Sequence, residues 1–136
     1  MTQINQQSGK PKGRLEHVNI SVTDPDRLAS LLQRLLGWEE RWRCPSQKYG
    51  RSVHIARGAA PGDDYIALYT GDHVKGEFVK SRPLNHVAFT VDDLEGAMQI
   101  VVDAGLTPLN HEVYDPGARF YLFDWDGIEF EIVSYT

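Results

Sequence analysis

The stretch LNHVAFTVDDLEGAMQIVVDAG, residues 84–105, has a counterpart upstream in LEHVNISVTDPDRLASLLQRLLG, residues 15–37. Both stretches run through a leucine, a polar residue and His-Val, then an alternating strand pattern, acidic residues, a helix pattern and a glycine. An apolar–polar alternation is typical of a half-buried strand, and apolar spacing of three and four residues is typical of an amphipathic helix. The sequence therefore contains two copies of one strand–helix unit, and each copy has a histidine, His17 or His86, in its predicted first strand.

The composition describes an ordinary globular protein. The chain has 136 residues, of which 41% are hydrophobic and 24% charged, a size and balance that suit one folded domain. A net charge of −5 argues against nucleic acid and against anionic membranes as partners, and no apolar run is long enough to span a bilayer. The single cysteine, Cys44, excludes an internal disulfide and a multi-cysteine metal site.

Residues 1–13 are polar and contain no apolar core of a signal peptide, so we expect a flexible tail and a cytoplasmic location. Residues 14–136 are expected to form one domain of two modules, at about 14–71 and 84–135, joined by a linker from Gly71 to Pro83. Each module is predicted to have the order βαβββ, which gives an α+β fold.

In the first module we expect a strand over Leu15–Val22 and a helix that starts at Asp24-Pro25 and stops at Gly37. Three further strands follow, at Trp38–Cys44, Arg51–Arg57 and Tyr65–Thr70. The second module repeats the order with a strand over Leu84–Val91 and a helix that opens on an apparent capping box, Asp92 and Glu95, and ends at Gly105. Its last strands are predicted at Thr107–Tyr114, Arg119–Asp124 and Ile128–Ser134.

Three of these strands send polar side chains to the side away from the helices. The apolar residues of each first strand belong under its helix, so His17 and His86 face the other way. In the last strand Glu129 and Glu131 likewise alternate with Phe130 and its apolar neighbours. Such a face is either simply solvated or, if the sheet curls into a cleft, the place where two imidazoles and a carboxylate converge on a divalent metal ion.

At these residues the chain resembles the vicinal-oxygen-chelate superfamily, which includes glyoxalase I, bleomycin-resistance proteins and extradiol dioxygenases. The resemblance covers essentially residues 15–135, and its other marker is the closing FYLFDWDGIEFEIVSY. It implies two βαβββ modules that pair into a curved mixed sheet with a cleft. It also implies a divalent metal (Mn, Fe, Zn or Ni) held by His17, His86 and Glu131, where Glu131 follows the turn glycine Gly127 by four residues.

The resemblance further implies a homodimer, in which a cleft draws His17 from one subunit and His86 with Glu131 from the other. At the position where glyoxalase I has a fourth metal ligand, this chain has Ala67. Alanine cannot bind metal, which argues against glyoxalase I activity itself. Glu129, His111, Tyr121 and His54 are the candidates for proton transfer, and Arg119 could hold an anionic substrate.

Three functions remain open at this point. The first is a metal-dependent enzyme, lyase- or isomerase-like, that chelates two adjacent oxygens of a small substrate. The second is an extradiol-type ring-cleaving dioxygenase, in which His111 and Tyr121 would lie near a bound catechol. The third is a metal-free binding protein of the bleomycin-resistance kind. The presence of all three ligand types at matching positions favours an enzyme.

Overall fold

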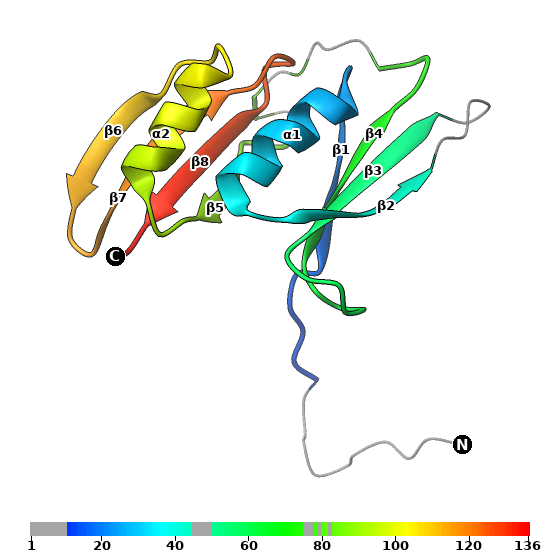
Figure 1. The fold of residues 1–136 in the computed structure, drawn as a ribbon, viewed down its shortest axis with the longest axis horizontal. Coiled ribbons are helices and arrows are strands. Elements are labelled where there is room, and N and C mark those ends of the chain that lie inside the picture. Colours follow the sequence, from blue (N-terminus) through cyan, green and yellow to red (C-terminus); the bar gives the residue numbers. More distant parts are fainter. Residues whose placement is uncertain (1–10, 45–49, 75–77, 79, 82) are drawn as a thin grey trace.

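Two modules of identical element order make up the protein (Figure 1). The structure, a computed structural model, describes residues 11–44, 50–74, 78, 80–81 and 83–136. The first module contains β1 (His17–Ser21), α1 (Pro25–Leu36), β2 (Glu39–Cys44), β3 (Arg51–Ala56) and β4 (Tyr65–Thr70). The second contains β5 (Val87–Thr90), α2 (Leu94–Asp103), β6 (Leu109–Tyr114), β7 (Gly117–Phe123) and β8 (Glu129–Ser134).

Each module forms a four-stranded mixed sheet, with the orders β1-β4-β3-β2 and β5-β8-β7-β6. The first strand of each module pairs in parallel with the last, β1 with β4 and β5 with β8, and the other neighbours are antiparallel. The α+β class and the βαβββ repeat predicted from the sequence are confirmed. Both β1 and β5 are edge strands of their sheets, and the two edges flank one cavity.

The helices begin and end close to the predicted residues. The side chain of Asp24 accepts a hydrogen bond from the amide of Arg27 at 3.1 Å, and α1 ends at Gly37, whose φ of 70° suits glycine. At α2 the predicted capping box is displaced by one residue. The N-cap is Asp93, whose carboxylate accepts from the amide of Gly96 at 2.9 Å, because its extended backbone brings the carboxylate over the first turn.

The predicted strand Leu84–Val91 is shorter in the structure, since β5 begins only at Val87. A turn precedes it, in which the amide of Ser81 donates to the carbonyl of Leu84 at 2.7 Å and the side chain of Asn85 donates to the Ser81 hydroxyl at 2.8 Å. His86 therefore stands directly before β5 rather than inside it.

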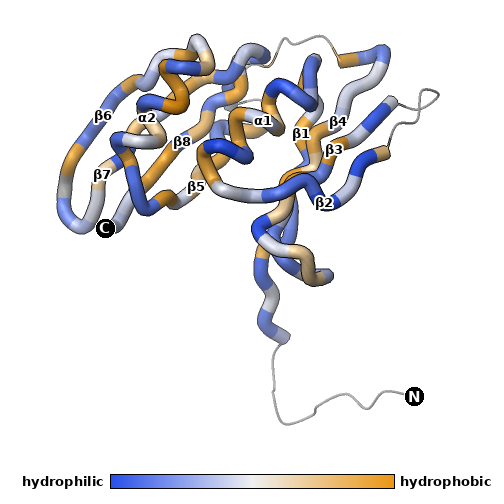
Figure 2. The backbone as a smooth tube through the Cα atoms, viewed as in Figure 1, coloured by the Kyte–Doolittle hydropathy of each residue, from blue (hydrophilic) through white to orange (hydrophobic). Residues whose placement is uncertain are grey.

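Hydrophobic residues occur along the helices and strands of both modules (Figure 2), and one hydrophobic core includes residues of both. Its largest fully buried side chains come from α1, from β3 and β4, and from β7 and β8 with the turn between them: Leu28, Leu31, Leu32, Ile55, Leu68, Phe120, Leu122, Ile128, Phe130 and Ile132. The two helices contact one another, and Thr23 donates through its amide and hydroxyl to the carboxylate of Asp126, at 2.9 and 2.7 Å. These contacts tie the first module to the turn between β7 and β8.

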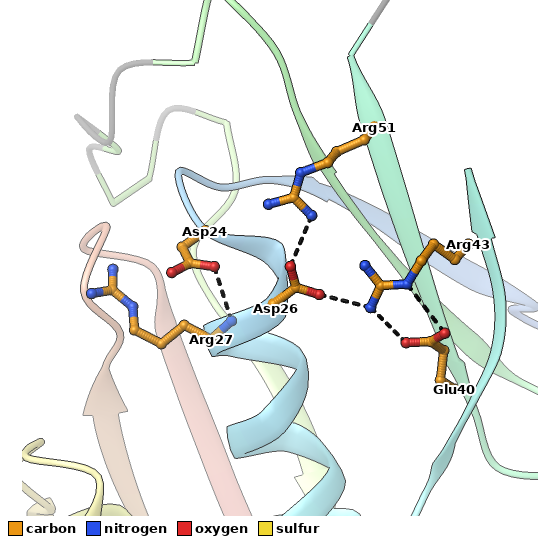
Figure 3. A network of polar contacts seen from close by, with 6 residues as sticks. All are labelled: Asp24, Asp26, Arg27, Glu40, Arg43 and Arg51. Atoms are coloured by element: carbon orange, nitrogen blue, oxygen red, sulfur yellow. Dashed lines mark hydrogen bonds and ion pairs between the residues drawn. The ribbon is translucent and has the colours of Figure 1, made fainter. Parts of the chain in front are cut away.

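On the surface, an ionic network ties the start of α1 to its own sheet (Figure 3). Asp26 accepts from Arg43 at 2.7 Å and from Arg51 at 3.0 Å, and Arg43 also contacts Glu40. The two guanidinium groups lie on β2 and β3, so α1 is held at its N-terminal end. Among the helices described, none is long and apolar enough to cross a membrane.

Candidate metal centre

His86 and Glu131 lie side by side on the helix-free face of the second sheet. The Nε2 atom of His86 is 3.1 Å from Oε1 of Glu131. Glu131 is placed by the pairing of β5 with β8, which sets it opposite Ala88, two residues beyond the histidine. The carboxylate is almost fully buried, with 8% of its side chain exposed, whereas the imidazole keeps 33%. The structure thus brings together two of the three metal ligands predicted from the sequence.

The neighbour of His86 in the chain selects the ring nitrogen that faces Glu131. Nδ1 of His86 lies 2.7 Å from Oδ1 of Asn85, and an amide oxygen can only accept a hydrogen bond. Nδ1 therefore carries the hydrogen, and in a neutral ring Nε2 offers a lone pair toward the carboxylate oxygen. The lone pairs of Nε2 and of Glu131 Oε1 would repel at this distance of 3.1 Å. A cation between the two atoms, either a proton on the ring or a metal ion, would stabilise the arrangement.

Each of the two glutamates of β8 has its own basic partner. Oε2 of Glu131 lies 2.7 Å from a guanidinium nitrogen of Arg119 on β7. Oε1 of Glu129 contacts the ammonium group of Lys80 and lies 3.7 Å from Nδ1 of His86. Of these two glutamates, Glu131 is the one next to the Nε2 atom of His86, and its role as a metal ligand stays a prediction.

A cavity of about 410 Å³ opens in front of this group of side chains. Tyr121 stands at its wall, and its ring is nearly perpendicular to that of His86, at 6.0 Å between ring centroids. The other lining residues are polar or charged: Lys80, Asn85, Asn110, Glu112 and Glu129. Tyr121 and Glu129, both predicted as proton-transfer groups, are therefore beside His86.

His17 lies in an equivalent setting on the first module. Its Nδ1 is 2.8 Å from a carboxylate oxygen of Glu16, the residue before it, so that Nε2 is again the nitrogen left for a ligand. The ring stacks on Tyr65 at 4.5 Å between centroids. Both histidines thus use the preceding side chain as the partner of Nδ1.

A row of rings crosses the first sheet from His17. Tyr65 stacks on His54 at 4.9 Å, and His54 packs against Trp42 at 4.6 Å. The guanidinium of Arg41 lies over the Tyr65 ring at 4.6 Å. Partial burial, with the nearby charges of Arg41 and His17, lowers the pKa of His54 below its usual value. The structure therefore places His54 in this row, separated from His17 by a tyrosine.

The strand registers explain why the first module lacks the carboxylate ligand. Ala67 pairs with Asn19 of β1 as Glu131 pairs with Ala88 of β5, and the two pairs occupy the same place in the two modules. Ala67 is therefore the counterpart of Glu131, as predicted. It offers the first module no oxygen there.

Within the described part of a single chain, His17 does not form a three-ligand group with His86 and Glu131. His17 lines a different cavity, of about 340 Å³, between the start of β1 and β4 on one side and Val87–Thr90 on the other. Across the described residues, no three side chains of His, Cys, Asp or Glu are grouped so that they could hold a metal ion. Of the three predicted ligands, His86 and Glu131 are thus paired in the second module, and His17 lies in the first module.

His111, predicted as an acid–base group, lies elsewhere. It borders a hollow on the side of α2, together with Glu95, Met98 and Val102. A register irregularity in β6 between Leu109 and Glu112 interrupts the alternation on which a prediction of its direction depends.

The sequence interpretation missed three neighbours of the site. Glu16 and Asn85 were signalled by their places directly before the two histidines, in LEH and LNH. Lys80 belongs to the segment between the modules, whose sequence gives no periodic pattern from which its position could be inferred.

The chain belongs to the glyoxalase/bleomycin resistance protein/dioxygenase superfamily, whose family model matches residues 16–123. No curated protein matches the sequence. Among solved structures, a glyoxylase/bleomycin resistance protein/dioxygenase domain from Frankia sp. EAN1pec is 23% identical, with a TM-score of 0.75. The match covers 93% of this chain and 100% of that one.

Two fosfomycin resistance proteins, both called FosX, have the same fold. The protein from Listeria monocytogenes, solved with Mn(II) and sulfate, is 19% identical, with a TM-score of 0.67. The protein from Mesorhizobium loti is 21% identical, with a TM-score of 0.65. Each match covers 93% of this chain and 95% of the other.

Proposed function

We propose that the protein is a metal-dependent enzyme that acts on a small substrate through two adjacent oxygen atoms. The metal is a divalent ion held by His86 and Glu131 of one subunit and by His17 of a second subunit in a homodimer. The contact between His86 Nε2 and Glu131 Oε1 is the observation that carries this proposal.

The residues fit such an ion in geometry and in chemistry. Ligand atoms about 2.0–2.2 Å from one metal, at angles between right and tetrahedral, are roughly 3.0–3.5 Å apart. The 3.1 Å separation of His86 Nε2 and Glu131 Oε1 falls in this range. Two imidazoles and one carboxylate suit Mn, Fe, Zn or Ni and leave positions open for substrate. The Mn(II) in the Listeria FosX structure supports the same class of ion.

The proposal uses two subunits because, in the described part of the chain, no third His, Cys, Asp or Glu joins His86 and Glu131 in a metal-binding group. His17 and His86 border different cavities, and each has its Nδ1 beside the side chain of the preceding residue, which leaves Nε2 for a ligand. A second copy of the chain would bring its His17 to the pair formed by His86 and Glu131, which completes a three-ligand set.

When bound, a divalent ion acts as a Lewis acid that stabilises negative charge developing on substrate oxygens. Around it, Glu129 is a carboxylate that is not a proposed ligand; it contacts Lys80 and lines the cavity. We assign Glu129 the role of proton acceptor at Oε2. The Tyr121 hydroxyl is the second group able to hold a proton there.

One observation favours a second function. The rings of Trp42, His54, Tyr65 and His17 form a row that could bind a planar aromatic compound without metal, as in the bleomycin-resistance kind of protein. Ring cleavage is not proposed, because His111 borders α2 instead of the cavity with Tyr121.

Metal analysis with an activity survey separates these functions. The purified protein would be stripped of metal, reconstituted in turn with Mn(II), Fe(II), Ni(II) and Zn(II), and assayed with fosfomycin, a 2-hydroxy ketone and a catechol. We expect a metal-dependent turnover of one class of vicinal-oxygen substrate. Binding of a planar aromatic compound by metal-free protein, with no metal retained after reconstitution, would instead support the second function.

A further inference from the structure

The carboxylate of Glu131 is shared between two partners on opposite sides. Oε1 lies 3.1 Å from Nε2 of His86, and Oε2 lies 2.7 Å from a guanidinium nitrogen of Arg119. Both side chains of the Arg119–Glu131 pair are shielded, with 19% and 8% exposed. The guanidinium of Arg119 thus binds Oε2, the oxygen of Glu131 that does not contact His86, and this contact is shielded from solvent.

The contact with Arg119 restricts how Glu131 could bind a metal, because a carboxylate can bind through one oxygen or through both. A charge-assisted hydrogen bond to Oε2 occupies that oxygen and fixes the carboxylate plane. Since the pair is shielded from water, the bond is stronger than an exposed ion pair and harder to exchange for solvent. Of the two carboxylate oxygens of Glu131, Arg119 therefore leaves Oε1 as the one next to His86.

The neighbouring glutamate provides an internal comparison. Glu129 is also close to a cation, Lys80, but that side chain is more exposed, and Glu129 does not face Nε2 of His86. Lys80 and Arg119 thus contact different carboxylates of the same strand, β8. Only one of those carboxylates is a proposed ligand.

We propose that Arg119 is a positioning residue, which holds Glu131 as a one-oxygen ligand for the divalent ion. The inference rests on the proposed function, because it assumes that Glu131 binds the metal. The expectation that Arg119 holds an anionic substrate stays a separate prediction, because the contact with Glu131 uses one guanidinium nitrogen.

The test is the affinity of the full-length protein for Mn(II) alone, measured from the electron paramagnetic resonance signal of the free ion. Partners that orient a metal ligand typically contribute about 10–100-fold in affinity. We expect a loss of that size in Arg119→Met, a smaller loss in Arg119→Lys, which retains one donor, and little change in the matched control Lys80→Met. Unfolding of the metal-free variants would be followed in parallel to confirm that they fold.

A double-mutant cycle distinguishes positioning from a general structural effect. With Glu131→Gln already present, adding Arg119→Met should cause little further loss of Mn(II) affinity. An equal loss in both backgrounds, or wild-type affinity in Arg119→Met, overturns the inference. If Arg119→Met does not fold, Arg119→Lys takes its place in the cycle, with the same criteria.

The two proposals fail in different ways. Wild-type protein that binds Mn(II), loses it in His86→Ala and keeps it in Arg119→Met contradicts only the role of Arg119. Wild-type protein that binds no Mn(II) overturns both the metal site and the positioning role.

Discussion

Asp124 is a buried carboxyl group in the turn between β7 and β8. Its Oδ1 accepts from the amides of Asp126 and Ile128, at 2.9 and 2.8 Å. Its Oδ2 is buried without a hydrogen-bond partner in the described part of the chain. Burial raises the pKa of Asp124 to about 6, against the opposing effect of the backbone amides.

Because the folded-state pKa exceeds the ordinary value of an aspartic acid, Asp124 favours the folded state while it is protonated. This stabilisation is complete below the unfolded pKa and is lost as pH rises through about 6. We predict that Asp124→Asn removes this dependence and is more stable than the native protein at neutral pH, by on the order of 2–3 kcal/mol. Urea unfolding at pH values on both sides of that window measures the effect, and parallel profiles for the two proteins would refute it.

The second prediction for a single residue concerns Asn85. Its amide oxygen fixes the hydrogen of His86 on Nδ1. Asn85→Ala should lower metal affinity by about tenfold because the ring loses its orienting partner. Asn85→Asp retains an acceptor oxygen and should bind metal more tightly than the alanine variant. The same measurement on Thr90→Ala, an exposed residue of β5, provides the control, and equal affinities in all variants would show that Nδ1 needs no partner.

At the scale of the elements, α1 is held to its sheet by two kinds of contact with different energies. The carboxylate of Asp26 and its arginine partners are largely exposed, so their ion pairs contribute little. Hydrogen bonding to Arg43 lowers the pKa of Asp26, and this stabilisation is present above the unfolded pKa and lost as pH falls. Leu32, by contrast, is fully buried beneath the helix.

We therefore predict that Leu32→Ala lowers the free energy of unfolding by about 2–5 kcal/mol. Asp26→Asn should lower it by less than about 1 kcal/mol, and high salt should reduce that difference further. Denaturant titrations at low and high salt provide both numbers. A larger cost for Asp26→Asn than for Leu32→Ala would mean that the ionic network, rather than the apolar face, holds the helix.

Element order and most element limits could be predicted from the sequence because they depend on local signals. β4 matches its prediction from Tyr65 to Thr70, and Gly37 ends α1 as expected. The errors occur where neighbouring residues compete for one role. Asp92 and Asp93 are both able to cap α2, and the turn at Ser81–Asn85 shortens β5 through contacts that no periodicity reveals.

On the scale of the whole molecule, the candidate site could be predicted only in part. The sequence alternation predicted that His86 and Glu131 share a face, and the structure brings them together; the repeat aligns Glu131 with Ala67. What sequence patterns do not contain is how the modules lie relative to one another. In this chain His17 and His86 border separate cavities, and our proposal takes the third ligand from a second subunit.

A mixed dimer tests that assembly. His17→Ala and Glu131→Ala subunits, carrying different tags, would be co-expressed and the heterodimer isolated. If each site takes His17 from one subunit and Glu131 from the other, one site of the heterodimer is intact and the second lacks both ligands. We predict one metal ion per heterodimer and none in either variant homodimer. A heterodimer without metal would place all three ligands in one chain, and a monomeric native protein would contradict the assembly itself.

The metal content of the native protein and its ligand variants tests the central claim most directly. After reconstitution and removal of free ion, we predict one divalent ion per chain in the native protein. His17→Ala, His86→Ala and Glu131→Ala should each lose it and remain folded, because the apolar side chains beneath the helices are unchanged. Glu129→Ala, on the same face of β8, should retain the ion. A native protein without metal, or metal content unaffected by the three ligand substitutions, would contradict the account.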